Sequence, residues 1–455
     1  MIRPLQGQTF KIDTIQFKGA TSEMVNIVIL GDGYTAAQMS TFVSNSTSFT
    51  TVFFNETPMK EYINYFNVFA IETPSTQTGA KHPGTASDCG GTVPVSNPTN
   101  YFGSSFDTGG IHRLLYPKNT STVQSVLASN MPSYDLVFIL VNSPYYGSGG
   151  GSYAAFSMEA SSNEIGKHEM GHSFGTLADE YWAGTQYAGE KANMTSQSSP
   201  TLVKWKNWVG INNVGVYAHS GSGASGWYKP HQNCKMQYLG KTFCNVCVET
   251  LIEKVHGIVN PIDSYSPSSS TVAISNNSLN FSLKLYKPNP NTLRTNWTLD
   301  GAAKNKNVDS VIINGTSLSN GSHQLVVTVL DTTYLTKNAQ HPTSHLYTVT
   351  WNINKTATGI DITDKINTSA ITLFPNPFNE NLALKTEIDE PTDISIIITD
   401  ITGKTMKKIN YGMLDAGTHE MNISKKVQHL SNGEYVISIY YNNQMVISKK
   451  IIKQS

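Results

Sequence analysis

Charged residues are scarce in this chain of 455 residues, since Asp, Glu, Lys and Arg make up 14% and 32 acidic side chains balance 32 basic ones. No run of Lys and Arg stands out, which excludes a general electrostatic attraction to nucleic acid or to an anionic membrane. Hydrophobic residues make up 39%. The low charge therefore indicates a folded chain and not a disordered one.

Long apolar runs are absent as well. No stretch approaches the roughly 20 apolar residues that span a bilayer, so we expect no transmembrane segment. The first residues, Met1-Ile2-Arg3-Pro4, lead into polar sequence and not into the apolar region of a signal peptide. The sequence therefore predicts either a cytoplasmic protein or one whose leader has been removed from this numbering.

Cysteine is rare too, and the four cysteines are Cys89, Cys234, Cys244 and Cys247. An even number of cysteines would form two disulfides in a secreted protein, and the sequence leaves all three pairings open. The alternative is a structural zinc ion held by Cys244-x-x-Cys247 and the other cysteines. Such sites prefer two C-x-x-C pairs, and the second pair is missing here.

A chain of this length exceeds what one hydrophobic core usually organises, which predicts two or three domains. The first 259 residues alternate apolar runs of strand length with segments of helical periodicity. We expect strands at 24–30, 66–71 and 135–141, and helices at 34–54, 119–129 and 246–259. This order predicts an α/β (α+β) domain over residues 1–259 with a twisted mixed sheet.

Helical periodicity nearly disappears after Asn260-Pro261. Short alternating segments separated by Asn, Gly, Pro and Asp turns predict an immunoglobulin-like β-sandwich over residues 260–355, with Trp297 and Trp351 in its core. Residues 356–371 have little pattern and are expected to form a linker. Residues 372–455 show the same alternation and predict a second all-β sandwich.

The chemistry-bearing motif is His168-Glu169-Met170-Gly171-His172. On a helix, residues four apart are separated by about 40° around the axis, so His168 and His172 can reach one metal ion. Glu169 lies beside them, where it can polarise a water molecule on the metal. Capping residues at 161–163 and an apolar Ile165 on the histidine face support a helix at this place.

A catalytic zinc ion takes three protein ligands and leaves one position for water, so a third donor must lie nearby. A turn at Gly175 would bring a carboxylate back toward the metal, and we prefer Asp179 to its neighbour Glu180. A further alternative is Glu190, because another zinc-peptidase plan takes its third ligand from a second helix roughly twenty residues further on. The segment around Glu190 lacks helical character.

The segment HEMGHSFGTLADEY, together with Cys234-Lys235-Met236-Gln237-Tyr238, resembles the metzincin plan of HExxHxxG, a third ligand and a Met-containing turn beneath the metal. It resembles more closely the bacterial metallopeptidase family that includes immunoglobulin A peptidase, whose members share this run and an early strand like NIVILGDGY at 26–34. The resemblance spans most of residues 20–255. It implies a zinc metalloendopeptidase with a metzincin-like fold.

One position departs from the metzincin pattern. The usual third ligand falls three residues after the Gly, where this chain has Ala178, so the ligand must shift to Asp179. The resemblance also implies that Met236 packs beneath the ligands without coordinating the metal. It further implies that Tyr238 approaches the zinc and stabilises the tetrahedral intermediate.

The resulting prediction is a single catalytic Zn²⁺ held by His168, His172 and Asp179, with Glu169 accepting a proton from the attacking water and returning it to the leaving amine. The Gly-rich loop 147–152 precedes the site. We expect it to be either a rim whose backbone pairs with an extended peptide or a flexible surface loop.

Three motifs near the carboxyl terminus, LFPNPF at 373–378, ITDITGK at 398–404 and LSNGEYV at 430–436, resemble the sorting domain read by the type IX secretion system of certain Gram-negative bacteria. This resemblance implies secretion machinery as a partner and a secreted or cell-surface location.

These expectations favour an endopeptidase that acts on extracellular protein, with host immunoglobulin or a mucin-like glycoprotein as candidate substrates. The alternative is a surface adhesin or glycoprotein-binding protein on a peptidase scaffold that has lost activity. The intact Glu169 argues against this alternative, because a decayed site has no chemical reason to keep the general base.

Overall fold

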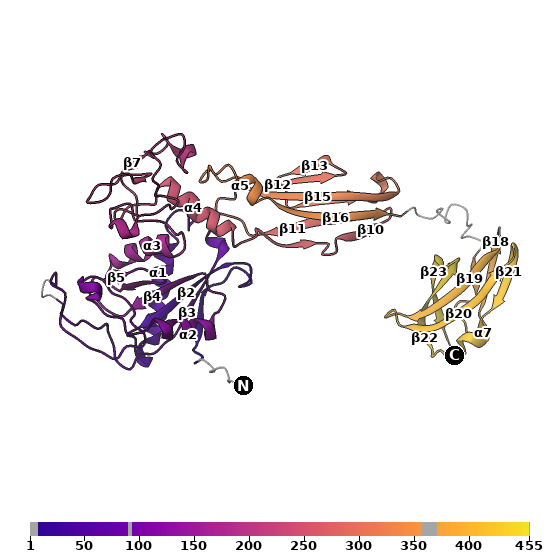
Figure 1. Cartoon of the computed structure of the whole chain (residues 1–455). Coiled ribbons are helices and arrows are strands. Elements are labelled where there is room, and N and C mark those ends of the chain that lie inside the picture. Colours follow the sequence, from indigo (N-terminus) through magenta and orange to yellow (C-terminus); the bar gives the residue numbers. More distant parts are fainter. Residues whose placement is uncertain (1–7, 90–92, 357–370, 455) are drawn as a thin grey trace, which may run out of the picture. The chain divides into compact units, whose positions relative to one another are not determined.

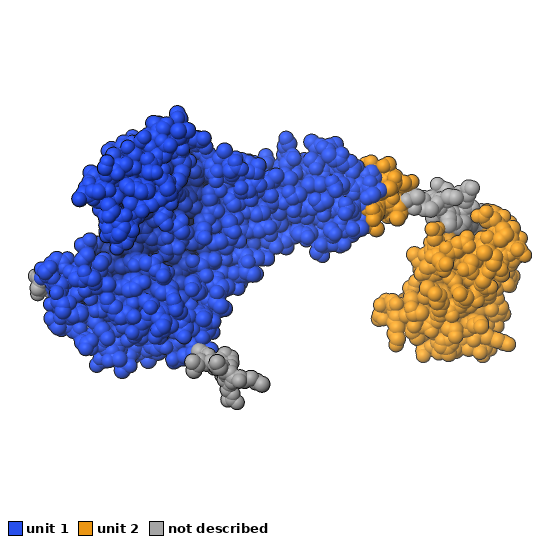
Figure 2. Space-filling model, in the orientation of Figure 1, with its two compact units in different colours: residues 1–272, 278–313, 322–353 blue, residues 273–277, 314–321, 354–455 orange. Residues whose placement is uncertain are grey.

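The computed structural model describes residues 8–89, 93–356 and 371–454. The chain divides into two compact units, which are coloured separately in Figure 2. The first unit contains residues 1–272, 278–313 and 322–353, and the second contains residues 273–277, 314–321 and 354–455. Most of the predicted linker 356–371 lies outside the described residues.

A six-stranded mixed sheet organises the amino-terminal part of the first unit (Figure 1). Its strands are β1 (Ile12–Gln16), β2 (Val25–Asp32), β3 (Phe66–Ile71), β4 (Leu136–Val141), β5 (Ser148–Gly149) and β6 (Ala154–Ser157). They lie in the order β1-β3-β2-β4-β6-β5. The inner strands β3, β2, β4 and β6 are parallel, and the edge strands β1 and β5 are antiparallel to their neighbours. The predicted mixed α/β architecture is confirmed for this part.

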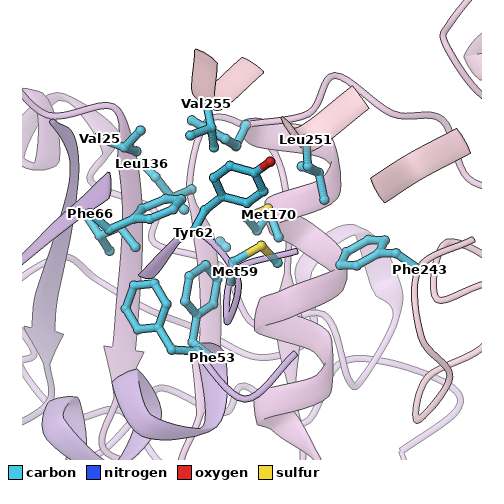
Figure 3. Packing of buried hydrophobic residues seen from close by; sticks show 14 of the residues in the cluster. Val25, Phe53, Met59, Tyr62, Phe66, Leu136, Met170, Phe243, Leu251 and Val255 are labelled. Carbon is cyan, nitrogen blue, oxygen red and sulfur yellow. The ribbon is translucent and has the colours of Figure 1, made fainter. Parts of the chain in front are cut away.

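Four helices pack on the two faces of this sheet, namely α1 (Met39–Phe53), α2 (Thr120–Asn130), α3 (Ser162–Ser173) and α4 (Asn245–His256). Successive strand residues point to opposite faces. Ile27 and Ile29 therefore share one core with side chains of α1, α3 and α4, whereas Val28 and Leu30 share the other core with α2. Figure 3 shows the first core, in which Met170 of α3 is one of the buried side chains. This burial fixes the orientation of helix α3.

The long segment between α3 and α4 has little regular structure. It contains the short 3-10 helices η4 (Thr185–Tyr187) and η5 (Lys206–Trp208) and a two-stranded ribbon of β7 (Tyr217–Ala218) and β8 (Tyr228–Lys229). Three other 3-10 turns lie earlier in the chain, namely η1 (Ala36–Gln38), η2 (Ile63–Tyr65) and η3 (Thr108–Gly110). Trp205 and Trp208 anchor the segment between α3 and α4, because both are buried in the same core as α4.

After α4 the chain forms two sheets. One has the order β10-β16-β15-β12-β13 and the other β14-β11-β9. The strands are β9 (Ile262–Ser266), β10 (Thr271–Ile274), β11 (Ser278–Leu285), β12 (Leu293–Leu299), β13 (Ala302–Lys306), β14 (Ser310–Asn314), β15 (Gly321–Asp331) and β16 (Tyr347–Lys355), with η6 (Gly315–Ser317) and α5 (His341–Ser344) between them. Trp297 and Trp351 are fully buried and stacked, with ring centroids 5.8 Å apart, as predicted for core residues.

Within the first unit, buried polar contacts join α4 and the segment before β3 to the following β-sandwich. The Asp331 carboxylate at the end of β15 accepts a hydrogen bond from the Tyr62 hydroxyl at 2.5 Å and lies 3.0 Å from His256 Nε2. Glu253 Oε1 lies 2.7 Å from His341 Nδ1. These two parts are therefore joined by specific ion pairs and not by apolar packing alone.

The carboxyl-terminal part of the second unit is rich in β-structure. It contains β17 (Thr372–Phe374), β18 (Ala383–Ile388), β19 (Thr392–Asp400), β20 (Thr405–Leu414), β21 (Gly417–Asn422), β22 (Gly433–Tyr441) and β23 (Gln444–Lys453), together with the one-turn helix α7 (Ser424–Val427). The sheets β17-β18-β21 and β20-β19-β22-β23 enclose an apolar core of their own. The predicted sheet-rich carboxyl-terminal region is confirmed. Among the described helices, none is long and apolar enough to cross a membrane.

Candidate functional site

Helix α3 follows strand β6 and carries the HExxH motif. The N-cap residue Ser161 does not cap the helix with its side chain, since its hydroxyl donates to Glu159 and not to the helix backbone. Ser162 Oγ instead lies 2.9 Å from Ser157 Oγ of β6, and Met170 is 1% exposed in the core. These contacts turn the histidine face of α3 away from the hydrophobic core.

The structure brings His168, His172 and Asp179 together. His168 Nε2 and His172 Nε2 are 3.1 Å apart, and each lies 3.2 Å from Asp179 Oδ1. The opposite ring nitrogens donate to backbone oxygens, His168 Nδ1 to Lys235 at 2.9 Å and His172 Nδ1 to Leu177 at 2.8 Å. Donation from Nδ1 leaves Nε2 of each ring as the nitrogen that faces Asp179 and can bind a metal ion after loss of any proton.

Three lone-pair donors at this separation fit a metal ion. Nitrogen and oxygen ligands bound at about 2.0–2.1 Å to a tetrahedral zinc ion lie about 3.4 Å from one another. Asp179 Oδ1 is buried, and the polar atoms that it faces are the Nε2 atoms of the two histidines. Burial lowers the pKa of His172, but the hydrogen bond with Asp179 and its charge raise this pKa to about 9. The site therefore favours a bound cation.

The segment that carries Asp179 is shaped by its backbone. Helix α3 ends at Ser173, and the left-handed residue of the following turn is Thr176 with φ 51°, where we expected the turn to depend on Gly175. A β-branched residue in this conformation is strained. Asn193 holds the next residues, since its side chain accepts from Ala178 N and donates to Ala178 O, each at 2.8 Å.

Glu169 projects from α3 beside the two histidines. Burial raises the pKa of its carboxyl group, although the nearby His168 and His172 act in the opposite direction. A carboxylate with a raised pKa is suited to act as a general base near neutral pH. The backbone of Gly150 lies directly against it, because a Cβ atom at Gly150 would lie 1.6 Å from Glu169 Oε2.

The Gly-rich loop 147–152 therefore packs on the general-base candidate. Ser148 N donates to Arg113 O at 2.9 Å, and Ser148 O accepts from Leu115 N at 3.1 Å. A rim that pairs with a substrate requires free backbone groups. The backbone groups of Ser148 are not free. Gly150 and Gly151 remain exposed.

Met236 lies beneath α3. Its side chain is fully buried, and a Cβ atom at Gly171 would lie 2.5 Å from its sulfur atom, so only glycine fits between the helix and this methionine. The preceding Lys235 is 1% exposed, and its ammonium group lies 2.5 Å from Glu164 of α3. Glu56, at 3.2 Å from Lys235, and Lys167, which pairs with both carboxylates, belong to the same ion-pair network. The network ties the Met236 segment to the metal-site helix.

Neither alternative third ligand faces the histidines. Glu180 is fully buried among three cysteine thiols, with Oε1 lying 3.3 Å from Cys247 Sγ. Glu190 is exposed, pairs with Lys204 at 2.7 Å and accepts from Ser196 N at 2.7 Å.

The expectation of two disulfides is wrong, because all four cysteines are free. Cys89 lies 3.6 Å from His82 Nε2, in a different cluster from the other three cysteines. The remaining three thiols surround Glu180.

A tyrosine that the sequence analysis did not consider, Tyr181, interacts with Asp179. Tyr238 is 50% exposed, and within the described residues no hydrogen bond joins its hydroxyl to the candidate ligands or to Glu169. The prediction for Tyr238 therefore has no supporting contact. Burial, the charge of Asp179 and a hydrogen bond to Asp179 raise the pKa of the Tyr181 hydroxyl. Its position two residues after Asp179 was the available sequence signal.

Residues 14–213 match the family model described as IgA Peptidase M64. This region is similar to M64 peptidases. The M64 match contains His168, Glu169, His172 and Asp179 and ends before Lys235 and Met236, which contact the site from outside the matched range. Residues 372–454 match the secretion system C-terminal sorting domain. The chain therefore carries a peptidase domain and a sorting tail, and it is a secreted or cell-surface protein.

Likeness to solved structures is low. The fibronectin(III)-like modules of Clostridium thermocellum CbhA have 9% sequence identity and a TM-score of 0.22, covering 42% of this chain and 94% of that one. The chicken interferon gamma receptor alpha chain has 9% identity and a TM-score of 0.19, covering 40% and 96%. Likeness at this level supports no conclusion about fold or function. No curated protein matches the chain.

Proposed function

We propose that the chain is a secreted zinc-dependent endopeptidase with a metzincin-like site. The observation that carries the proposal is the convergence of His168 Nε2, His172 Nε2 and Asp179 Oδ1 within 3.2 Å of one another, beside the carboxylate of Glu169. Two neutral imidazoles and a carboxylate are the donor set of a catalytic zinc ion with one open position.

Each residue has a distinct role in peptide hydrolysis. Zinc at this site would supply Lewis acidity, which polarises the scissile carbonyl and lowers the pKa of water to about 7. Glu169 accepts the proton of the attacking water and passes it to the leaving nitrogen. The backbone oxygens of Lys235 and Leu177 hold the rings of His168 and His172 in the required tautomer.

Tyr181 is our candidate for stabilising the oxyanion. Tyr181 lies two residues after Asp179, and burial together with the charge of the Asp179 carboxylate raises the pKa of the Tyr181 hydroxyl. From there it can donate a hydrogen bond to the negative charge that develops on the carbonyl oxygen during attack, which is typically worth a factor of about 10²–10³ in kcat. Met236 would serve as the methionine of the turn beneath the ligands.

The substrate class follows from location and family. The sorting tail places the site outside the cell, where it meets extracellular proteins, with the secretion machinery as the partner of the tail. The family description names immunoglobulin A as the target of M64 peptidases. We therefore propose host immunoglobulins, and secondarily mucin-like glycoproteins, as substrates.

Metal analysis of matched variants tests the donor set. We expect Asp179→Ala to lose the zinc that Glu190→Gln retains, because Glu190 is a surface carboxylate paired with Lys204. If Asp179→Ala keeps the full zinc content of the wild-type protein, the proposed third ligand is wrong. Glu169→Gln should keep the metal and lose cleavage. Equal and weak degradation by this variant and the wild type would favour the adhesin alternative.

A further inference from the structure

A second cluster of metal-ligating side chains lies in the peptidase part, separate from the histidines. It consists of Glu180, Cys234, Cys244 and Cys247, which come from three segments of the chain and are all buried. Glu180 directly follows Asp179, and the two side chains point to different clusters, as consecutive residues of an extended segment do. We propose that these four residues bind a second, structural zinc ion.

The separations between the ligand atoms fit tetrahedral coordination. Thiolates bound to zinc at about 2.3 Å lie about 3.8 Å apart, and a thiolate lies about 3.5 Å from a carboxylate oxygen on the same ion. In the structure Cys247 Sγ lies 3.7 Å from Cys234 Sγ and 3.6 Å from Cys244 Sγ. Glu180 Oε1 lies 3.3 Å from Cys247 Sγ and 3.8 Å from Cys244 Sγ. Four ligand atoms therefore already surround one point.

The same groups are poorly satisfied without a cation. Glu180 Oε2 is buried without a hydrogen-bond partner, in a side chain that is fully buried. Disulfide formation does not account for the arrangement, because a bonded pair lies about 2.05 Å apart and three thiols always leave one unpaired. A metal ion bound by all four side chains would explain why a buried carboxylate lies beside three thiols.

Hydrogen-bond donors and positive charge lie around the cluster. Cys244 is the N-cap residue of α4 and Cys247 lies in its first turn, so both are at the positive end of the helix dipole. The Cys244 backbone N–H donates to Cys234 Sγ at 3.3 Å. The buried ammonium group of Lys229 lies 2.6 Å from the Glu180 backbone oxygen. This positive charge offsets part of the net negative charge of three thiolates, one carboxylate and Zn²⁺.

Four protein ligands leave no open position for water, which indicates a structural and not a catalytic ion. The ion would join the segments that position the catalytic ligands. Glu180 N donates to Met236 O at 2.7 Å, and Lys235, whose oxygen orients His168, directly follows Cys234. The second zinc ion therefore fixes the Asp179 segment and the Met236 segment against each other.

Elemental analysis of the full chain provides the first test. We expect two zinc ions per chain in the wild-type protein, one in Cys247→Ser and Glu180→Gln, and one in His168→Ala. Glu190→Gln is the matched control for the carboxylate and Cys89→Ser for the thiol, and both should retain two. A zinc content that is the same in the wild-type protein, Cys247→Ser and Glu180→Gln overturns the second site.

Cobalt substitution provides a second test that needs no cysteine variant to fold. Thiolate ligands give Co²⁺ a strong sulfur-to-metal charge-transfer absorption, which histidine and carboxylate ligands do not give. We expect this absorption in the wild-type protein, in His168→Ala and in Cys89→Ser. Its absence from the wild-type protein would refute thiolate coordination, and two fewer alkylated thiols in the unreduced, denatured chain would show a disulfide instead.

These measurements distinguish an error in the catalytic proposal from an error in the second-site proposal. If only the catalytic proposal is wrong, wild type and His168→Ala both hold one zinc ion and both show the cobalt–thiolate absorption. If only the second site is wrong, the wild-type protein holds one zinc ion that His168→Ala loses, and neither protein shows the absorption.

Discussion

Substituting Gly150 by alanine should impair catalysis while leaving the fold and the metal intact. A Cβ atom at this position would lie 1.6 Å from Glu169 Oε2 and 2.4 Å from Glu169 Cδ. Ordinary contact begins at about 3.4 Å, so the carboxylate must retreat by about 1.8 Å or the loop must move away. The clash is with the far end of a flexible side chain, so we expect little loss of stability.

The expected cost is in turnover. Misplacing a reacting group by about 1 Å typically lowers the rate by about 10²-fold, which corresponds to about 2.7 kcal/mol in the activation free energy. We therefore expect Gly150→Ala to reduce kcat by about 10²-fold at unchanged zinc content, measured as initial rates on one protein substrate. KM should change less, because Glu169 acts on the water and not on the bound peptide.

Gly189→Ala is the matched control for this experiment. A Cβ atom at Gly189 meets no heavy atom within 4 Å, so its turnover and melting temperature should equal those of the wild-type protein. If Gly150→Ala retains kcat within about twofold of Gly189→Ala, Gly150 does not position Glu169 and the reasoning is wrong.

Three further perturbations probe the surroundings of the site. Tyr181→Phe should lower kcat by about 10²-fold without loss of zinc, whereas the kcat of Tyr238→Phe should equal that of the wild type. The reverse result in the two kinetic assays would return the oxyanion role to Tyr238. Lys235→Met removes one of two lysines that pair with Glu56 and Glu164, the other being Lys167, and should lower the free energy of unfolding in urea by about 3 kcal/mol. A loss below about 1 kcal/mol would show that Lys167 alone satisfies the two carboxylates. Burial raises the pKa of Asp331, but its hydrogen bonds, first the one with His256, outweigh burial and leave the pKa lowered. This stabilisation is present above about pH 4 and is lost as the pH falls through the folded-state value, so Asp331→Asn should flatten the acid limb of the unfolding free energy measured against pH.

The elements with strong local patterns were predictable from the sequence. The apolar runs of β2, β3 and β4 gave the sheet strands, and the helix expected around His168 and His172 is α3. A four-residue spacing places both imidazoles on one face whatever the rest of the fold does. This is why the local part of the site could be derived before the tertiary structure.

The remaining features depend on contacts between distant segments. The path to Asp179 requires a left-handed Thr176 and the amide of Asn193, and neither has a local sequence signal. The even number of cysteines indicated disulfides. No spacing pattern in the sequence reveals that Glu180 lies among three of them. Tyr238 was preferred through its distance from Met236, whereas the interaction of Tyr181 with Asp179 has no counterpart in that motif.

The central claim is that the Glu169 carboxylate at the histidine site hydrolyses peptide bonds. The most direct test is to incubate mixed serum and mucosal proteins with wild-type protein or with Glu169→Gln of equal zinc content, and to sequence the newly formed amino termini. The account predicts that defined new termini accumulate with the wild-type protein and are absent with Glu169→Gln. The same termini with both proteins, or none with zinc-loaded wild-type protein, would contradict it.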